Sequence, residues 1–327
     1  MKEYVDSVFC YYREHGFPFY PTDVDWRKKE WEKLKTYASL HDVLDENGNL
    51  RQTMHGLALA GSFHPHMFSI ECNGMKTPMQ LFNDDTLFRK VIERRIKIGD
   101  NMSDSGMRKM LKIFTGSQCV SNFRPTAACA LYNKYADGGI VWDMSGGYGG
   151  RMLGFAVSRA AGYLYTEPAT QTANGLNEMS DWLKSNGGCN KAIAQIDGLK
   201  GSEDADVSKY RESIDFCFTS PPYFNTEHYS YEPTQSFVRY DTKEAWRTNF
   251  LLKTFMNCRD VLKPGRKMAI NIANVKTYPN LEEDCVKTAL EAGFSLCCTH
   301  RYLLSNFAKD PSNITYKTEP VFVFSKQ

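Results

Sequence analysis

The chain has 327 residues, of which 42% are hydrophobic and 24% charged, an ordinary composition for a globular protein. Its net charge is only +2, which excludes a global electrostatic attraction to nucleic acid, so any such attraction must be local. The ten cysteines are scattered, and no apolar run approaches the length of a membrane span. We therefore expect a cytoplasmic protein without a disulfide framework or a membrane partner.

Residues 1–115 are predicted to form a mainly helical module. Helical spacing of apolar residues indicates helices over Tyr4–His15, Trp26–Tyr37 and Met79–Ile98. Basic residues gather between Arg89 and Lys112, which suits a solvated helix face and a phosphate contact equally well. The module is thus a candidate for contacting DNA. His64-Pro65-His66 has no further ligand at metal spacing, so no metal site is predicted.

From residue 116 to residue 327 the sequence changes to alternating strands and helices. Strands are expected near 139–143, 162–166, 192–196, 214–219, 267–273, 294–300 and 320–325. Such alternation implies an α/β fold with a mostly parallel, doubly wound, Rossmann-like sheet.

A glycine-rich turn follows the first of these strands. The strand Gly139–Asp143 leads into Met144–Arg151, which contains four glycines and precedes a helical run from Met152 to Ala161. Glycines at such a turn let the backbone approach a ligand closely. Glu167 closes the next strand, where this architecture holds a ribose diol. The turn lacks the Gly-Lys-Ser/Thr of a kinase loop, and it breaks the spacing of a dinucleotide site.

A second motif, Thr219-Ser220-Pro221-Pro222-Tyr223-Phe224, follows the apolar run Ile214–Phe218. The two prolines lack amide donors and have a fixed φ, so the strand must end there. Free carbonyls, a serine hydroxyl and a tyrosine ring then stand at the carboxyl end of a strand, where open α/β sheets bind ligands. Such a pocket suits a planar ring with an amino group, because the oxygens accept from the amine while the tyrosine stacks on the ring.

Together, the two motifs resemble those of S-adenosylmethionine-dependent amino-methyltransferases that act on DNA bases. The Thr-Ser-Pro-Pro-Tyr form is most similar to the cytosine-N4 branch. The resemblance covers residues 117–327 and implies a class I methyltransferase sheet that ends in an antiparallel hairpin. It departs at Met144 and Ser145, where DNA-modifying members usually carry Pro-Phe.

The resemblance also implies roles for individual residues. The S-adenosylmethionine site is expected to comprise Phe123, Pro125, Thr126, Asp143, Ser145, Gly147, Gly149, Glu167, Asp197 and Thr219. Catalysis is assigned to Ser220, Pro221, Pro222 and Tyr223. Apart from the resemblance, the aromatic and polar composition of the segment after the motif predicts contacts with the target nucleotide through Phe224, Asn225, His228, Tyr231 and Arg239, in a cluster that also includes Tyr229, Gln235, Ser236 and Tyr240. A mobile active-site lid is the alternative interpretation of this segment. No large recognition insert is evident, so the segments 224–245 and 303–317 and the N-terminal module are the candidates for holding DNA.

The resulting hypothesis is a DNA methyltransferase that moves a methyl group to an exocyclic amine of a flipped base, with cytosine N4 favoured over adenine N6. Methylation of RNA or of a free nucleotide is the alternative that the low charge and the missing insert would suit. A non-catalytic nucleic-acid-binding module is a third. The expected partner is DNA, either as a duplex with a flipped base or single-stranded. A companion restriction enzyme is a further possible partner, if the protein belongs to a restriction-modification system. The sequence leaves the oligomeric state open.

Overall fold

The computed structural model describes residues 2–306 and 316–326. Its helices are α1 (Lys2–His15), α2 (Val24–Leu40), α3 (Leu57–Ser62), α4 (Pro78–Asn83), α5 (Asp85–Lys97), α6 (Asp104–Ile113), α7 (Pro125–Tyr135), α8 (Gly150–Val157), α9 (Thr170–Ser185), α10 (Ser236–Arg239), α11 (Lys243–Trp246), α12 (Lys253–Val261) and α13 (Leu281–Glu291). Its strands are β1 (Asn49–Arg51), β2 (Glu71–Cys72), β3 (Ile140–Asp143), β4 (Gly162–Tyr165), β5 (Ala192–Gln195), β6 (Ile214–Thr219), β7 (Glu227–His228), β8 (Leu262–Asn271), β9 (Phe294–Asn306) and β10 (Tyr316–Lys326).

The main sheet has the strand order β1-β9-β10-β8-β6-β3-β4-β5. Strands β3 to β6 and β8 run parallel, whereas β10 is antiparallel to both β8 and β9. This arrangement is the Rossmann-like sheet of class I methyltransferases with its antiparallel hairpin, and it confirms the predicted fold class.

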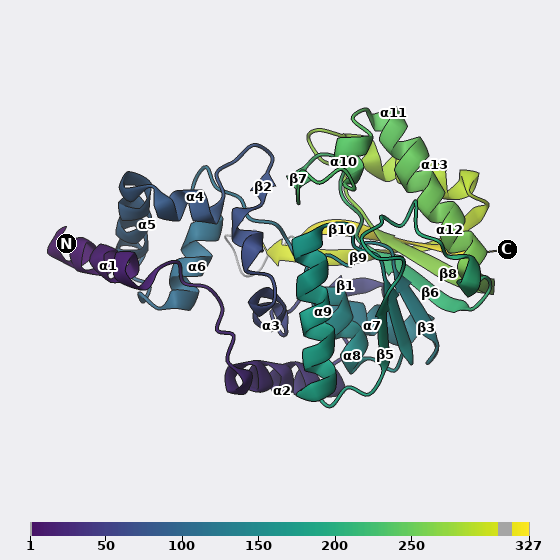
Figure 1. The fold of residues 1–327 in the computed structure, drawn as a ribbon, viewed down its shortest axis with the longest axis horizontal. Coiled ribbons are helices and arrows are strands. Elements are labelled where there is room, and N and C mark those ends of the chain that lie inside the picture. The colour runs from purple at the N-terminus through teal and green to yellow at the C-terminus, as the bar shows by residue number, and fades with distance from the viewer. Residues whose placement is uncertain (1, 307–315, 327) are drawn as a thin grey trace.

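Helices cover both faces of this sheet (Figure 1). Side chains alternate along β6, so Phe216 and Phe218 enter the core beneath α7 and α8 while Cys217 enters the core beneath α12 and α13. All six residues of β6 are buried. This explains why β6 reads in the sequence as a nearly continuous apolar run, as central parallel strands do.

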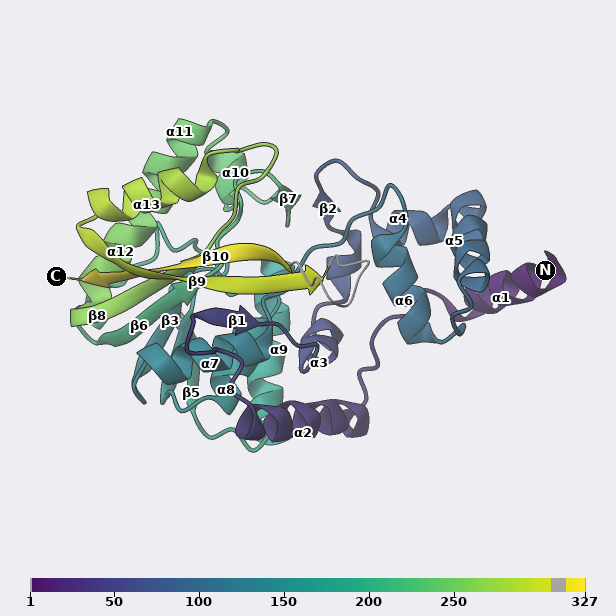
Figure 2. The same cartoon turned by 180° about the vertical axis from the view of Figure 1, so that it is seen from behind.

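The N-terminal third does not form one separate module, which corrects the predicted boundary at residue 115. Strand β1 extends the main sheet, pairing in parallel with β9 from Asn49 against Arg301. Trp31, Leu34 and Leu50 belong to the core of the catalytic half. Helices α1 and α4 to α6 instead form a lobe with its own core, and Figure 2 shows them to one side of the sheet. A three-residue strand is too short to produce a readable alternation, so its pairing could not be predicted.

The helix predicted over Met79–Ile98 is two helices. Asp84 ends α4 and begins α5, because its carboxylate accepts a hydrogen bond from Leu87 N at 2.9 Å. Thr77 and Gln80 form a capping box at the start of α4. The chain therefore turns at the Asn-Asp-Asp segment, and the two helices pack separately into the core of the lobe.

Much of the basic cluster between residues 89 and 112 has a structural use. Arg108 is buried and donates to the carbonyls of Pro18 and Phe19 at 2.8 and 3.0 Å. Arg95 is also buried, and Arg89 pairs with Asp6. Three exposed residues on one face of α5, the α5 cation row (Lys90, Arg94 and Lys97), form no ion pair with any other described residue.

A two-stranded ribbon connects the helical lobe to the segment that follows the proline motif. Strand β2 pairs antiparallel with β7, with Glu71 opposite His228 and Cys72 opposite Glu227 (Figure 1). Within residues 2–306 and 316–326, no helix has both the length and the apolar character needed to cross a membrane.

Candidate active site

A cavity of about 380 Å³ lies at the carboxyl ends of the central parallel strands. Ser145 enters it after β3, Glu167 after β4, Ser220 after β6 and Asn271 at the end of β8. Residues of the glycine turn and of the proline motif therefore line one cavity, as open α/β sheets place their ligands. Its volume is within the range of small-molecule sites.

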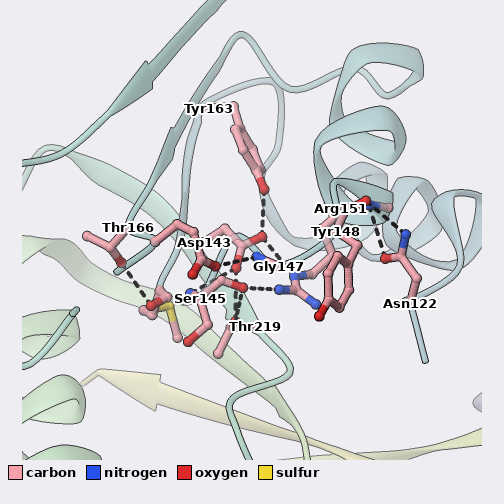
Figure 3. Close-up of polar contacts among 12 residues, drawn as sticks. Asn122, Asp143, Ser145, Gly147, Tyr148, Arg151, Tyr163, Thr166 and Thr219 are labelled. Carbon is pink, nitrogen blue, oxygen red and sulfur yellow. Dashed lines mark hydrogen bonds and ion pairs between the residues drawn. The ribbon is translucent and has the colours of Figure 1, made fainter. Parts of the chain in front are cut away.

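The glycine turn is held close to the segment that precedes α7. Gly147 and Gly149 have φ values of 57° and 76°, which favour glycine over other residues. A Cβ at Gly150 would collide with the carbonyl oxygen of Phe123 and with the side chain of Asn122. Asn122 in turn accepts from Gly150 N and donates to Tyr148 O, at 3.2 and 2.9 Å (Figure 3). The glycines thus allow two loops to form one wall of the cavity.

Asp143 lies beneath this wall and has no exposed surface. One carboxylate oxygen accepts from Thr219 Oγ1 at 2.9 Å, and the other accepts from Arg151 Nε at 2.7 Å and from Tyr163 OH at 2.5 Å (Figure 3). Asp143 and Thr219 were predicted to contact the methyl donor, but neither lines the cavity. They instead join the glycine turn to the end of β6, because their polar atoms are already paired with each other.

Glu167 faces the cavity and is held by backbone donors. Its carboxylate accepts from Gly147 N at 2.8 Å and from Ala169 N at 3.0 Å. Burial raises the pKa of Glu167 to about 7, although these two hydrogen bonds act in the opposite direction. The side chain is therefore close to its titration midpoint at neutral pH.

The predicted donor-site residues divide into two groups. Phe123, Ser145, Gly147 and Glu167 line the cavity. The other six predicted residues do not line the cavity: Pro125, Thr126, Gly149, Asp197, Asp143 and Thr219. Thr126 Oγ1 lies 2.9 Å from Thr53 Oγ1 inside the fold, and Asp197 pairs with Lys200 at 2.9 Å. Sequence position placed them at strand and helix ends, but only the folded backbone determines which way each side chain points.

Glu203 and Gln235 also line the cavity; Glu203 was missed, whereas Gln235 belongs to the aromatic–polar cluster that the sequence predicted after the proline motif. Glu203 Oε1 accepts from Arg239 at 3.1 Å, but Glu203 Oε2 and Gln235 Nε2 are buried without a hydrogen-bond partner among the described residues. Burial raises the pKa of Glu203 to about 7. A Cβ at Gly201 would collide with the Glu203 carboxylate, so this glycine makes room for it. Both residues lie in irregular segments, where no periodic pattern marks them.

All four residues of the predicted catalytic motif, Ser220 to Tyr223, line the cavity. The Tyr223 hydroxyl lies 3.4 Å from both Glu319 Oε2 and the carbonyl oxygen of Asn271. Burial, together with the nearby Glu319, raises the pKa of Tyr223, so the phenol stays protonated. Phe224 has a φ of 56° and turns away, packing against Trp246 and Tyr278. The structure therefore places Phe224 in the core and not in the cavity lining, where a contact with the target was predicted.

The other predicted target residues also lie outside the cavity. His228 stacks on Phe237 with ring centroids 4.7 Å apart, Tyr231 donates to Glu71 at 3.1 Å, and Arg239 pairs with Glu203 and Asp204. Asn225 is exposed. The same segment instead lines the cavity with Thr226, Glu227, Tyr229, Thr234, Gln235 and Ser236. The segment was recognised from its composition, which cannot show which side chains face inward. Of the stretch 303–317, residues 307–315 lie outside the described residues.

His64 and His66 pack beside the glycine turn. His64 Nδ1 lies 3.0 Å from the Ala60 carbonyl oxygen, and its ring meets Tyr148 edge-on. His66 Nε2 lies 3.1 Å from Thr172 Oγ1. In the part of the chain that the structure describes, no three His, Cys, Asp or Glu side chains are grouped to hold a metal ion.

No protein-family model matches this chain, and no curated protein matches it. Its structural neighbours include a methyltransferase from Pyrococcus furiosus, which is 14% identical, with 72% of this chain and 98% of that chain covered and a TM-score of 0.40. A SAM-dependent methyltransferase from Methanosarcina mazei is 12% identical, with 57% and 92% covered and a TM-score of 0.37. The 1,6-didemethyltoxoflavin-N1-methyltransferase of Burkholderia thailandensis, solved with S-adenosylhomocysteine, is 9% identical, with 57% and 71% covered and a TM-score of 0.36. The fold assignment rests on the strand order and register of the sheet.

Proposed function

We propose that this protein transfers the methyl group of S-adenosylmethionine to an exocyclic amino group of a nucleic-acid base, with cytosine N4 in DNA as the favoured target. One observation carries the proposal: the glycine turn with Glu167 and the Ser-Pro-Pro-Tyr loop line the same cavity. A donor bound beside the turn and an amine bound beside the loop would thus meet in one enclosed space. Such positioning is a major source of rate acceleration in a displacement reaction.

The residues present fit the donor. Glu167 offers carboxylate oxygens to ribose hydroxyls, as an acid in this position does in related sheets. The unpaired Glu203 Oε2 and Gln235 Nε2 form an acceptor and a donor, which complement the amino group and a ring nitrogen of adenine. Pro168 and Phe250 add apolar surface to this part of the cavity. When bound, S-adenosylmethionine would supply a methyl group activated by a positive sulfur.

The proline loop fits the acceptor. The Ser220 hydroxyl and the Pro221 carbonyl can accept from an exocyclic NH2, while the Tyr223 ring stacks on the base. The target must leave the duplex, because its amino group cannot be reached inside a base pair. Ser220 in place of aspartate favours cytosine N4 over adenine N6. RNA or a nucleotide remains the alternative substrate. The small net charge of the chain favours this alternative.

Radiolabelled methyl transfer to DNA and to RNA, followed by nucleoside mass spectrometry, tests this function. We expect N4-methylcytosine in DNA. Ser220→Ala and Tyr223→Ala should abolish transfer while S-adenosylhomocysteine binding, measured by calorimetry, persists. Ser39→Ala is the matched control, because this serine is exposed at the end of α2. If only RNA is methylated, RNA and not DNA is the substrate. If the protein does not bind the donor, a non-catalytic binding module is favoured.

A further inference from the structure

The proline loop of this chain carries no carboxylate of its own, since Ser220 occupies its first polar position. An amine that receives a methyl group becomes acidic and must release a proton. A serine hydroxyl can accept a hydrogen bond from the amine but is a poor proton acceptor at neutral pH. The cavity therefore needs a basic group from elsewhere in the chain if the proton is to leave within the enclosed site.

Two glutamates from distant segments line the cavity near the loop, Glu227 of β7 and Glu319 of β10. Glu227 already has partners in β2 and in its own segment. Its Oε2 accepts a hydrogen bond from Tyr229 OH, and its Oε1 lies 4.0 Å from Cys72 Sγ. Glu319 lies on the other side, with Oε2 3.4 Å from Tyr223 OH. Of the two, Glu319 is the carboxylate in direct contact with the catalytic loop.

The strand pairing holds Glu319 in place. It pairs with Tyr302 of β9, and its neighbour Pro320 accepts from Asn271 Nδ2 at 3.1 Å. Asn271 ends β8 and lines the same cavity. The carboxylate is thus carried on β10, which pairs with both β8 and β9, and not on the segment that follows the loop.

We propose that Glu319 is the proton acceptor of the reaction, acting on the amine bound at Ser220. This inference rests on the proposed function and adds a catalytic residue to it. As the amine nitrogen forms its bond to the methyl carbon, the carbon–sulfur bond breaks and its electron pair stays on sulfur. As positive charge develops on the nitrogen in this same transition state, one of its protons passes to the Glu319 carboxylate, which later releases it to water.

The surroundings of Glu319 set its proton affinity. Burial raises the pKa of Glu319, while hydrogen bonds from Asn271 and Tyr223 oppose the shift. The titratable or charged groups that interact electrostatically with Glu319 are Tyr223, Tyr302, Glu227, Glu282 and Lys317. A raised pKa improves a carboxylate as a base, provided that it is still ionised at the working pH. The rate of methyl transfer should therefore rise with pH as Glu319 ionises, and then level off.

The test is single-turnover methyl transfer by Glu319→Gln across pH 5 to 8.5, on the polymer that the native protein methylates and with S-adenosylmethionine saturating at every pH, so that the pH dependence of donor binding does not contribute. We expect a rate about 10²–10⁴-fold lower, the usual contribution of a positioned base, and loss of the acidic limb of the pH profile. Glu227→Gln should keep that limb. Glu283→Gln is the matched control, since this glutamate pairs with Lys287 on the surface of α13. S-adenosylhomocysteine affinity should be unchanged in all three variants.

A Glu319→Gln protein that transfers methyl groups at the native rate with the native pH profile would overturn the proposal. If the Glu319→Gln protein shows no cooperative melting transition and is therefore unfolded, the Glu319→Asp variant tests the role of Glu319 instead. A shortened carboxylate should keep the acidic limb of the pH profile, and a folded Glu319→Asp protein that transfers methyl groups at the native rate without this limb would refute the role. A native protein that binds the donor but methylates neither DNA nor RNA would instead contradict the proposed function.

Discussion

Donor affinity should fall steeply below neutral pH, because two carboxyl groups that fit the donor are buried. Burial raises the pKa of both Glu167 and Glu203 to about 7. Each group therefore carries its proton in much of the free protein at pH 6, whereas the ionised form is the better acceptor for a hydroxyl or an amine. Ligand binding should favour the ionised forms and release protons.

The magnitude follows from linkage. For one carboxylate with a pKa of about 7 that must be ionised, the dissociation constant rises about tenfold between pH 8 and pH 6. For two such groups the rise is about a hundredfold. At pH 7 each group is about half protonated, so about one proton should be released for each ligand bound.

Calorimetry with S-adenosylhomocysteine, in buffers of different ionisation enthalpy, measures both the affinity and the released protons. Glu203→Gln should remove one titration and reduce the hundredfold change to about tenfold. At pH 8 it should weaken binding about tenfold, or about 1.4 kcal/mol, because a neutral acceptor replaces a charged one. Glu283→Gln should match the native protein, because Glu283 is exposed on α13 and does not line the cavity. A dissociation constant that stays constant from pH 6 to pH 8, or an unchanged slope in Glu203→Gln, would refute this reasoning.

Three further outcomes are expected. Arg151→Met should lower the free energy of unfolding by about 3–5 kcal/mol in urea titrations, because it leaves the buried Asp143 carboxylate without its cation; a loss below about 1 kcal/mol would contradict this. Gly150→Ala should cost about 1–3 kcal/mol and weaken donor binding by displacing the Phe123 segment. Gly162→Ala, whose added Cβ meets nothing closer than 3.4 Å, should leave binding unaffected, and equal behaviour of the two variants would show that the close approach is unimportant. Glutamine at all three positions of the α5 cation row should reduce the salt dependence of DNA binding by up to about 2.7 in logarithmic slope. An unchanged slope would place DNA elsewhere on the surface.

The sequence was sufficient for the fold of the catalytic half because its strands are strongly marked. Buried parallel strands such as β6 are nearly continuous apolar runs, and each ends at a turn that glycine or proline defines. The two motifs could also be placed at one rim in advance, since the carboxyl ends of parallel strands meet at the same edge of a sheet. Ser220, Tyr223, Ser145 and Glu167 were found for this reason.

The sequence could not predict the direction of individual side chains or the pairing of segments far apart in the chain. The sequence marked Asp143 and Glu167 alike as acids at the ends of neighbouring strands, yet Asp143 is the last residue of β3 and is buried against Arg151, whereas Glu167 lies two residues beyond β4 and faces the cavity. The difference depends on which partners the folded chain brings within hydrogen-bonding distance. Composition likewise identified the segment after the proline loop but not which of its residues point inward.

The sequence by itself determined the alternation of strands and helices and the two loops that line one cavity at the rim of the sheet. Local patterns are enough for this, because periodicity and turn chemistry depend on neighbouring residues. Only the tertiary structure decided that β1 joins the main sheet, that Glu203 and Gln235 line the cavity, and that Glu319 contacts Tyr223. These contacts join segments far apart in the chain, and they depend on strand register and on the packing of irregular loops, which no local pattern encodes.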